Sequence, residues 1–296
     1  MTWHVIFKYN FMKIQFTKMS GAGNDFVVVD NRRNIITDPH KFAVSICNRR
    51  LGIGADGLLL VEKSNHTAFM MKYYNADGSN AGMCGNGGRC IAKFAYDNGI
   101  VTSESFKFEA FGYDYKTIRH APMLYELWMK DPIDLRLSQN IPFNDSLYKG
   151  NYINTGTDHS VIFLEDNQQL GSLETLEVSK IGIAIRFHDI YQPAGTNVNF
   201  VSKGGSKSIQ IRTYERGVED ETLACGTGSV ASALLSSLKY GFKSPISVLV
   251  KSGKTLEINF EKINQDKFQN VRLKGPAETV FTGVVDIDNS LDLVYM

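Results

Sequence analysis

The sequence predicts an α+β protein built from two similar lobes, with its active site in the cleft between them. Strand patterns recur along the whole chain, helical patterns are few, and two matching glycine-rich motifs lie nearly half a chain length apart. A chain of 296 residues is long enough for two domains of roughly 150 residues each. A chain of this length can bury a sizeable hydrophobic core.

Strands should supply most of the regular structure. Apolar and polar residues alternate in several segments, and a period of two residues is typical of half-buried strands. The clearest of these segments contain Met12, Ile14 and Phe16; Phe69, Met71 and Tyr73; Phe106 and Phe108; and Leu256, Ile258 and Phe260.

Four segments favour helices. The pair Asp38-Pro39 forms an N-cap and a first helical turn, and residues 173–191 carry apolar residues with a helical period. Two further helices should begin directly after Cys84 and Cys225, because runs of apolar residues follow the glycines there. Both cysteines therefore lie at predicted helix N-termini.

The two halves of the chain resemble each other. In the same order, Cys84-Gly85-Asn86-Gly87 matches Cys225-Gly226-Thr227-Gly228, Tyr74-Asn75 matches Tyr214-Glu215, and residues 23–29 match residues 156–163. A repeat of this length indicates a duplicated domain, so the lobes should be related by a pseudo-two-fold axis.

A change of pattern near Asp131-Pro132 predicts the boundary between the lobes, because a strand gives way there to a polar stretch. The resulting division is an N-terminal appendage at residues 1–11, a first lobe at 12–130 and a second lobe at 131–281. We expect the last strand, at about 282–296, to return to the first lobe.

The composition excludes several classes of partner. Lysine plus arginine number 32 and aspartate plus glutamate 31, so the net charge of +1 gives no reason to expect nucleic acid or an anionic membrane. No apolar run approaches the ~20 residues of a membrane-spanning helix, and residues 1–11 lack the marks of an export signal. Four irregularly spaced cysteines fit a reducing cytoplasm, and no Cys-x-x-Cys or His-Glu-x-x-His spacing indicates a metal site. We therefore expect a cytoplasmic protein that binds a small molecule, and the sequence leaves a homodimer open.

Each Cys-Gly-x-Gly motif places a thiol beside the free N–H groups of a helix N-terminus. We expect this position to lower the thiol pKa below its usual ~8.5 and to create a binding site for a carboxylate. A single motif of this kind is more often a buried cysteine before a turn. Its repetition in matching halves favours a function.

A pseudo-two-fold axis between the lobes would bring Cys84 and Cys225 face to face. This arrangement suits inversion of a carbon that carries an acidic hydrogen, because a thiolate removes the proton from one face while a thiol delivers one to the other. The two helix N-termini would stabilise the negative charge that develops on the substrate carboxylate. Such a reaction requires no cofactor if the site is dry.

The segments that carry this pattern are similar to those of the diaminopimelate epimerase family. They are SGAGNDF at 20–26, GIGADG at 52–57, NADGS at 75–79, MCGNGGRC at 83–90, GTNVNF at 195–200, YERG at 214–217 and ETLACGTG at 221–228. The resemblance runs from about Met12 to Asp286. It implies that each lobe is a mixed β-sheet wrapped around a central helix.

The resemblance also implies a cofactor-independent isomerase that interconverts LL- and meso-2,6-diaminoheptanedioate, a step toward lysine and peptidoglycan. Cys84 and Cys225 would be the two bases, and His159 and Glu215 would assist them. The substrate-binding residues would be Gly85, Asn86, Gly226 and Thr227 at the reacting end, and Asn24, Asn75, Asn197, Glu215 and Arg216 around the rest of the pocket. The planar guanidinium of Arg216 suits the second carboxylate of such a substrate.

Two positions depart from the pattern of the family. Where the family commonly has Gly-x-Pro-His, with asparagine frequent at x, this chain has Gly156-Thr157-Asp158-His159. The position after Gly-Ile-Gly-x-Asp is often glutamine and is Gly57 here. Both changes concern substrate affinity rather than the type of reaction.

Structural roles remain open for some of these residues. Asn24 could occupy a left-handed turn, Arg216 could pair with Glu219 on the surface, and His159 could be a packed residue. Cys47 and Cys90 are predicted to be core residues.

Two other functions compete with this interpretation. A proline or hydroxyproline racemase of the same architecture would use the same cysteine pair, but Asn75, Asn197 and the Glu215-Arg216 pair suit a substrate with an amino acid at both ends. Alternatively, the facing thiols could form a disulfide in a redox-responsive binding module. Such a module would not exchange the α-hydrogen of a substrate with solvent, even when fully reduced.

Overall fold

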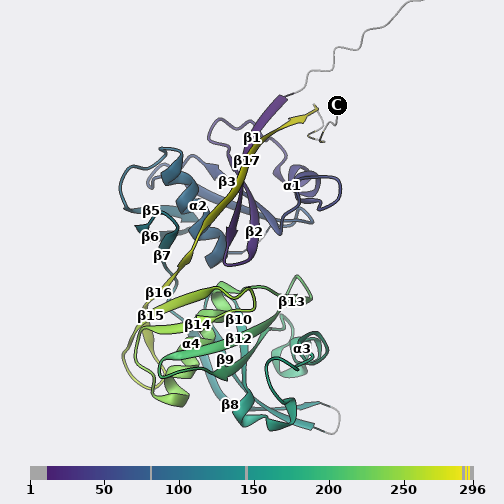
Figure 1. The fold of residues 1–296 in the computed structure, drawn as a ribbon, viewed down its shortest axis with the longest axis vertical. Coiled ribbons are helices and arrows are strands. Elements are labelled where there is room, and N and C mark those ends of the chain that lie inside the picture. The colour runs from purple at the N-terminus through teal and green to yellow at the C-terminus, as the bar shows by residue number, and fades with distance from the viewer. Residues whose placement is uncertain (1–11, 81, 144–145, 289–290, 292, 294–296) are drawn as a thin grey trace, which may run out of the picture.

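The computed structural model describes residues 12–80, 82–143, 146–288, 291 and 293. The appendage predicted at residues 1–11 lies outside the described residues. Two lobes lie one above the other along the long axis of the molecule (Figure 1). Within the described ranges, no helix has the length and apolar character needed to cross a membrane.

The N-terminal lobe is a mixed sheet around one buried helix. Its strands are β1 (Met12–Gly21), β2 (Asn24–Asp30), β3 (Gly57–Glu62), β4 (Met70–Asn75), β5 (Ser105–Ala110), β6 (Tyr113–Ala121) and β7 (Leu124–Trp128), and its helices are α1 (Pro39–Cys47) and α2 (Gly85–Asp97). Strand β2 pairs with β1 in an antiparallel and with β3 in a parallel manner. Helix α2 packs against strands on several sides, so the sheet wraps around it.

The C-terminal lobe repeats this plan. Its strands are β8 (Ile133–Phe143), β9 (Ser146–Asn154), β10 (Asp158–Phe163), β11 (Asn197–Lys203), β12 (Ser208–Glu215), β13 (Asp220–Thr222), β14 (Ile246–Leu249), β15 (Thr255–Lys262) and β16 (Phe268–Pro276). Its helices are α3 (Val178–Arg186) and α4 (Gly226–Tyr240), with the short 3-10 turns η1 (Leu164–Asp166), η2 (Gln168–Leu170) and η3 (Asp189–Tyr191). Strand β10 pairs antiparallel with β9 and parallel with β11, as β2 does with its neighbours.

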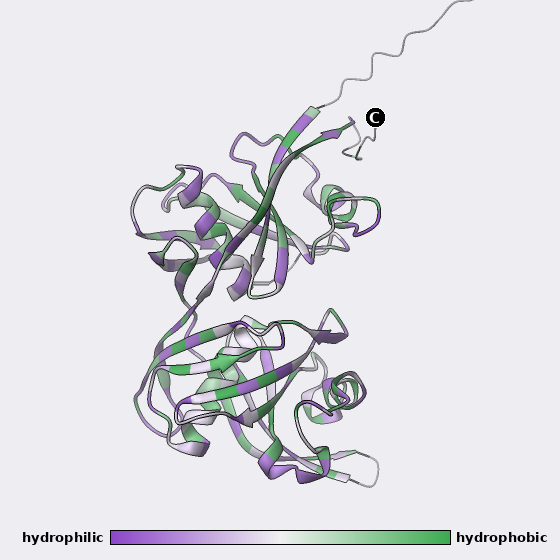
Figure 2. Cartoon of the chain, viewed as in Figure 1, coloured by the Kyte–Doolittle hydropathy of each residue, from purple (hydrophilic) through white to green (hydrophobic). Residues whose placement is uncertain are grey.

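Two strand pairings connect the lobes. Strand β7 pairs with β16, and β17 (Glu278–Ile287) returns to pair along the length of β1 (Figure 1). The predicted boundary between residues 130 and 131 stays a prediction, and it lies between β7 and β8. The α+β class is confirmed. Figure 2 shows hydrophilic residues in purple and hydrophobic residues in green along the strands, the alternation from which strands were predicted.

The predicted helices after Asp38, Cys84 and Cys225 are confirmed as α1, α2 and α4. The helical run predicted at 173–191 is shorter, because α3 begins only at Val178 and ends at Arg186. The side chain of Arg212 binds the carbonyl groups of Leu173 and Leu176. These carbonyls are therefore unavailable to a helix that starts earlier.

Both central helices are almost completely enclosed at their N-terminal ends. Residues 85–95 of α2 and residues 226–237 of α4 are all buried. A helix that is buried on all sides needs small residues where another backbone approaches it, and both helices begin with glycine. The fully buried side chain of Leu273 on β16 lies against both of these glycines, Gly85 and Gly226.

Leu273→Ala should therefore destabilise the fold by about 2–5 kcal/mol, because it leaves a cavity beneath both helix starts. The free energy of unfolding, measured in urea, checks this. Leu249→Ala is the control, since that side chain on β14 is 37% exposed and should cost less than about 1 kcal/mol. Equal losses in the two variants would contradict the position of Leu273 in the core.

Candidate active site

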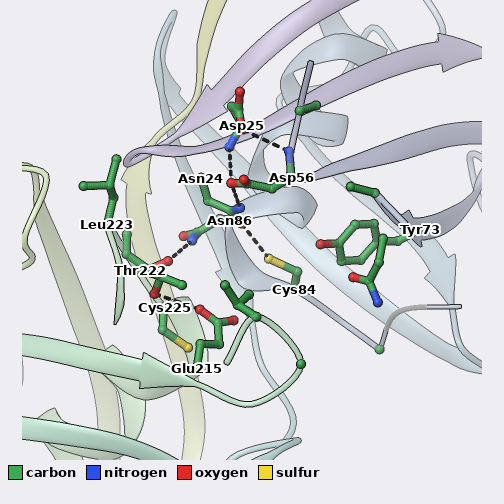
Figure 3. A pocket seen from close by; sticks show the side chains of 18 of the residues that line it. Asn24, Asp25, Asp56, Tyr73, Cys84, Asn86, Glu215, Thr222, Leu223 and Cys225 are labelled. Atoms are coloured by element: carbon green, nitrogen blue, oxygen red, sulfur yellow. Dashed lines mark hydrogen bonds between the residues drawn. The ribbon is translucent and has the colours of Figure 1, made fainter. Parts of the chain in front are cut away.

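A cavity of about 1140 Å³ lies between the two lobes, and both contribute to its walls (Figure 3). Most of the predicted site residues line it: Asn24, Asn75, Cys84, Gly85 and Asn86 from the first lobe, and Asn197, Glu215, Arg216, Cys225, Gly226 and Thr227 from the second. His159 is completely buried behind the wall. The fold thus brings together two sets of residues that are far apart in the sequence.

The N-termini of α2 and α4 meet at this cavity. A Cβ atom placed on Gly226 would lie 3.4 Å from the backbone nitrogen of Asn86, and one placed on Gly85 would lie 3.8 Å from the Cα atom of Gly226. The Asn86 side chain bridges the helices by donating a hydrogen bond of 3.1 Å to the carbonyl of Ala224. Both helix dipoles therefore point their positive ends at one region.

Cys84 and Cys225 are the N-caps of these two helices. The thiol sulfur of Cys84 accepts a hydrogen bond from the backbone N–H of Gly87 at 3.4 Å, and that of Cys225 accepts one from Gly228 at the same distance. The Cys84 thiol also donates to the side-chain oxygen of Asn24 at 3.5 Å. The two cysteines thus have matching positions in the two lobes.

Burial has the opposite effect on the thiols to the one expected from the helix N-termini. It raises the pKa of Cys84 to about 11, although the Gly87 N–H partly offsets this effect. Burial and the nearby carboxyl group of Glu215 raise the pKa of Cys225 well above its ordinary value. The expected lowering of the thiol pKa is therefore wrong, because removal from water outweighs the hydrogen bonds that the backbone N–H groups donate to the sulfur atoms.

Glu215 provides a proton acceptor beside Cys225. Burial raises the pKa of its carboxyl group to about 7, and hydrogen bonds from Thr222 and from the Cys225 thiol limit the rise. The Thr222 hydroxyl donates to Glu215 at 2.9 Å. A carboxyl group that titrates near neutrality is well suited to exchange a proton with the thiol.

His159 reaches Cys225 only through two hydroxyl groups. Its Nε2 atom lies 2.9 Å from the hydroxyl of Thr157, which donates to the hydroxyl of Thr227 at 3.2 Å. The Thr227 hydroxyl in turn lies 3.5 Å from the Cys225 sulfur. Burial lowers the pKa of His159 to about 3, so the ring is neutral. The hydroxyl of Thr157 therefore connects His159 to Thr227, which an apolar residue could not do.

The side chain of Asn86 is engaged inside the protein rather than in the cavity. Its oxygen accepts a hydrogen bond of 2.8 Å from Arg89, a fully buried residue that also donates to the carbonyl of Gly85. Only the backbone N–H of Asn86 remains for a ligand.

Arg216 forms an ion pair with Asp158, which belongs to the segment Gly156-Thr157-Asp158-His159. Its Nη1 atom lies 2.9 Å from a carboxylate oxygen of Asp158, whose other oxygen accepts hydrogen bonds from Tyr152 and Asn154. In the described part of the chain, Nε and Nη2 of Arg216 have no protein partner. The alternative pairing of Arg216 with Glu219 is wrong, because Glu219 pairs with Arg186. The ion pair leaves one edge of the guanidinium available for an anion.

The structural roles considered for Cys47, Cys90 and Asn24 have different outcomes. Cys47 and Cys90 are buried, as predicted. Asn24 is not a left-handed turn residue, because the positive φ angles belong to Ala22 and Gly23 before it. Its amide instead donates to Asp56 at 2.5 Å.

A cluster of charges that the sequence did not single out forms one end of the cavity. Asp25 binds Arg49 at 2.7 Å and the buried Lys18 at 2.6 Å. Burial alone would raise the pKa of Asp25, but the two cations outweigh it and lower the pKa to about 2. Asp56 joins the cluster through Arg49. The pairings of β2 with β1 and with β3 bring these residues together, so no local sequence signal could identify the cluster.

Among the described residues, no group of three or more histidine, cysteine, aspartate or glutamate side chains is arranged to hold a metal ion. The groups that could act on a ligand are the two thiols, the Glu215 carboxyl group, the helix N-termini and the Arg216 guanidinium. These groups can bind a carboxylate and exchange protons.

Glu215 should make the wild-type protein less stable as pH rises, and Glu215→Gln should remove this dependence on pH. The pKa of this carboxyl group is about 7 in the folded protein, above the ordinary value of 4.5 that applies to the unfolded chain. The folded state therefore binds more protons between these values, and stability falls as pH rises through them. In urea titrations, the free energy of unfolding of the variant minus that of the wild type should increase from about pH 5 to about pH 8. A difference that is the same at both pH values would contradict the raised pKa.

Comparison with known proteins identifies relatives over most of the chain. The family model described as diaminopimelate epimerase matches residues 16–118 and 151–280. The chain is 41% identical over 277 residues to the diaminopimelate epimerase of Chlorobaculum tepidum, covering 91% of this chain and 100% of that protein. It is 39% identical over 291 residues to that of Methanocella arvoryzae, covering 94% and 99% respectively.

Solved structures show the same fold at low sequence identity. A probable proline racemase from Agrobacterium radiobacter has a TM-score of 0.71 and 13% identity, covering 95% of this chain and 96% of that one. A hydroxyproline epimerase from Agrobacterium vitis has a TM-score of 0.70 and 14% identity, covering 94% and 93% respectively. At these identities the likeness concerns the fold alone.

Proposed function

Because the chain belongs to the diaminopimelate epimerase family, we propose that it is an isomerase that interconverts LL- and meso-2,6-diaminoheptanedioate with Cys84 and Cys225 as the two bases. This reaction would supply meso-diaminoheptanedioate for lysine and peptidoglycan synthesis. The observation that carries the proposal is the meeting of two cysteine-capped helix N-termini at one cavity.

The reaction needs one thiolate and one thiol. In the proposed cycle, Glu215 takes the proton of Cys225, and the resulting thiolate removes the α-hydrogen of the substrate. Cys84 keeps its proton through its hydrogen bond to Asn24 and delivers that proton to the opposite face of the carbon. The C–H bond breaks on one side and a new one forms on the other, so the centre inverts. In the reverse reaction the two thiols exchange roles.

The substrate itself would help to form the thiolate. Burial raises the pKa of both thiols. An α-ammonium group bound between them brings a positive charge into the same poorly hydrated space, and a nearby opposite charge favours the thiolate. The active ionisation state would thus arise only after substrate binds.

The helix N-termini would hold the carboxylate at the reacting carbon. Removal of the α-hydrogen transfers negative charge to this carboxylate, and free N–H groups fixed in position stabilise the charge as it develops. The backbone N–H groups of Gly85 and Asn86, and of Gly226 and Thr227, begin α2 and α4 and are the proposed donors.

Arg216 would bind the carboxylate at the distal end of the substrate. Asp158 occupies Nη1, while Nε and Nη2 form the edge of the guanidinium that matches a carboxylate. Asn75 and Asn197 line the same cavity and are the proposed partners of the distal amino acid. A distal amino acid distinguishes this substrate from proline.

Turnover of LL-diaminoheptanedioate by the reduced protein tests the function directly. We expect formation of the meso isomer, with L-proline and trans-4-hydroxy-L-proline unchanged under the same conditions. Racemisation of proline without action on diaminoheptanedioate would favour the proline racemase alternative. A reduced protein that exchanges no α-hydrogen with solvent would favour the redox module.

Cys84→Ala and Cys225→Ala should each lower the epimerisation rate by more than about 1,000-fold, since inversion needs a proton-transfer group on both faces. Cys90→Ala is the matched control, because Cys90 lies in the hydrophobic core and should leave most of the activity. The measurement is the initial rate of meso isomer formation under reducing conditions. A rate near that of the wild type in either of the first two variants would rule out the two-thiol mechanism.

Arg216→Lys should raise KM for diaminoheptanedioate by roughly 10-fold or more and affect kcat less, because lysine keeps the charge but lacks the planar pair of donors. Arg136→Lys, at an ion pair with Asp134 outside the cavity, is the control. Steady-state kinetics check this expectation. An unchanged KM in Arg216→Lys would mean that the guanidinium does not bind the distal end.

A further inference from the structure

Tyr73 is a pocket residue that the mechanism above does not use. It lies on β4 and lines the cavity, and its hydroxyl points inward toward Cys84 (Figure 3). The next residue, Tyr74, belongs to the opposite face of the strand, where it packs against the ring of His40 at 5.0 Å in the core around α1. Strand alternation thus gives two neighbouring tyrosines different environments.

The space for the Tyr73 ring depends on Gly57. A Cβ atom placed on Gly57 would lie 2.4 Å from Cε2 of Tyr73, so the ring occupies the volume that any other side chain at position 57 would need. On its other side the ring packs edge-to-face against Phe26, with 5.7 Å between centroids. The ring is therefore fixed, and its hydroxyl has a defined position in the cavity.

The Tyr73 hydroxyl has no hydrogen-bond partner among the described residues. Burial raises its pKa well above the ordinary value. The group therefore stays a neutral O–H donor throughout the physiological pH range. Tyr73 is half-buried and its hydroxyl faces the cavity, so this donor is available to a bound ligand.

The surroundings indicate which ligand group this donor would bind. In Figure 3 the hydroxyl end of the Tyr73 ring points toward Cys84. The hydroxyl thus lies on the Cys84 side of the site, close to the carbon that is proposed to react. A phenol O–H in this position suits an anionic oxygen, and the anionic oxygens at the reacting end of an amino acid are those of its carboxylate.

We propose that the Tyr73 hydroxyl donates a hydrogen bond to the carboxylate at the reacting carbon of the substrate, from the Cys84 side of the pocket. Tyr73 would then act together with the helix N-termini, as a donor fixed before the substrate arrives. The proposal rests on the epimerase function stated above. It is also consistent with Gly57, where a Cβ atom would lie 2.4 Å from the tyrosine ring and 2.5 Å from the backbone oxygen of Tyr74.

Tyr73→Phe tests the proposal, because it removes the hydroxyl and keeps the ring. We expect kcat/KM for LL-diaminoheptanedioate to fall by roughly 100-fold, the lower end of the range found when one donor to a developing anion is removed. The rate of solvent deuterium incorporation at the α-carbon should fall with it. The midpoint of urea unfolding should stay near that of the wild type, because no protein contact is lost.

Tyr74→Phe is the matched control, since it removes a hydroxyl one residue away that does not line the cavity. Its kcat/KM should remain within about twofold of the wild type. Equal kcat/KM values for Tyr73→Phe and Tyr74→Phe would overturn the proposal. A clear drop in the urea unfolding midpoint of Tyr73→Phe would also overturn it, because the loss of activity would then follow from a damaged fold. A wild-type protein without activity on diaminoheptanedioate would instead refute the proposed function, so the two failures are distinguishable.

Discussion

The contact between the N-termini of α2 and α4 is the constraint on which the rest of the site depends. Glycine at the first position of each helix allows the two backbones to approach, and Leu273 packs beneath both. The approach brings a cysteine N-cap and a set of free N–H groups from each lobe to one cavity. Neither lobe alone provides both faces of the site, so the duplication of the fold and the proposed chemistry are linked.

Burial sets the ionisation state of the thiols more strongly than the hydrogen bonds from the helix N-termini do. It raises the pKa of both thiols, and it brings the carboxyl group of Glu215 close to neutrality. Thiols with raised pKa values are poor nucleophiles at neutral pH. The charge of the substrate would change this balance, which would confine the reactive thiolate to the occupied site.

The sequence predicts the parts of the site that depend on local signals. Glycines after Cys84 and Cys225 identified the helix starts, and the repeat identified two lobes. The thiol pKa could not be predicted, because the cost of burial depends on packing from both lobes. The partner of Arg216 was also missed, since Asp158 lies on β10 and the two are distant in sequence. Alternation placed Tyr73 in a strand, but only the position of the second lobe makes its face the wall of a cavity.

The most direct test of the two-base account is the early time course of LL-diaminoheptanedioate turnover in deuterated water under reducing conditions. Two separate bases predict that the first meso product carries one deuterium at the inverted carbon while the remaining LL substrate carries none, because the donating thiol exchanges with solvent before each turnover. Product that retains the original hydrogen would instead show that a single group removes and returns the proton. That result would contradict a pair of thiols acting from opposite faces.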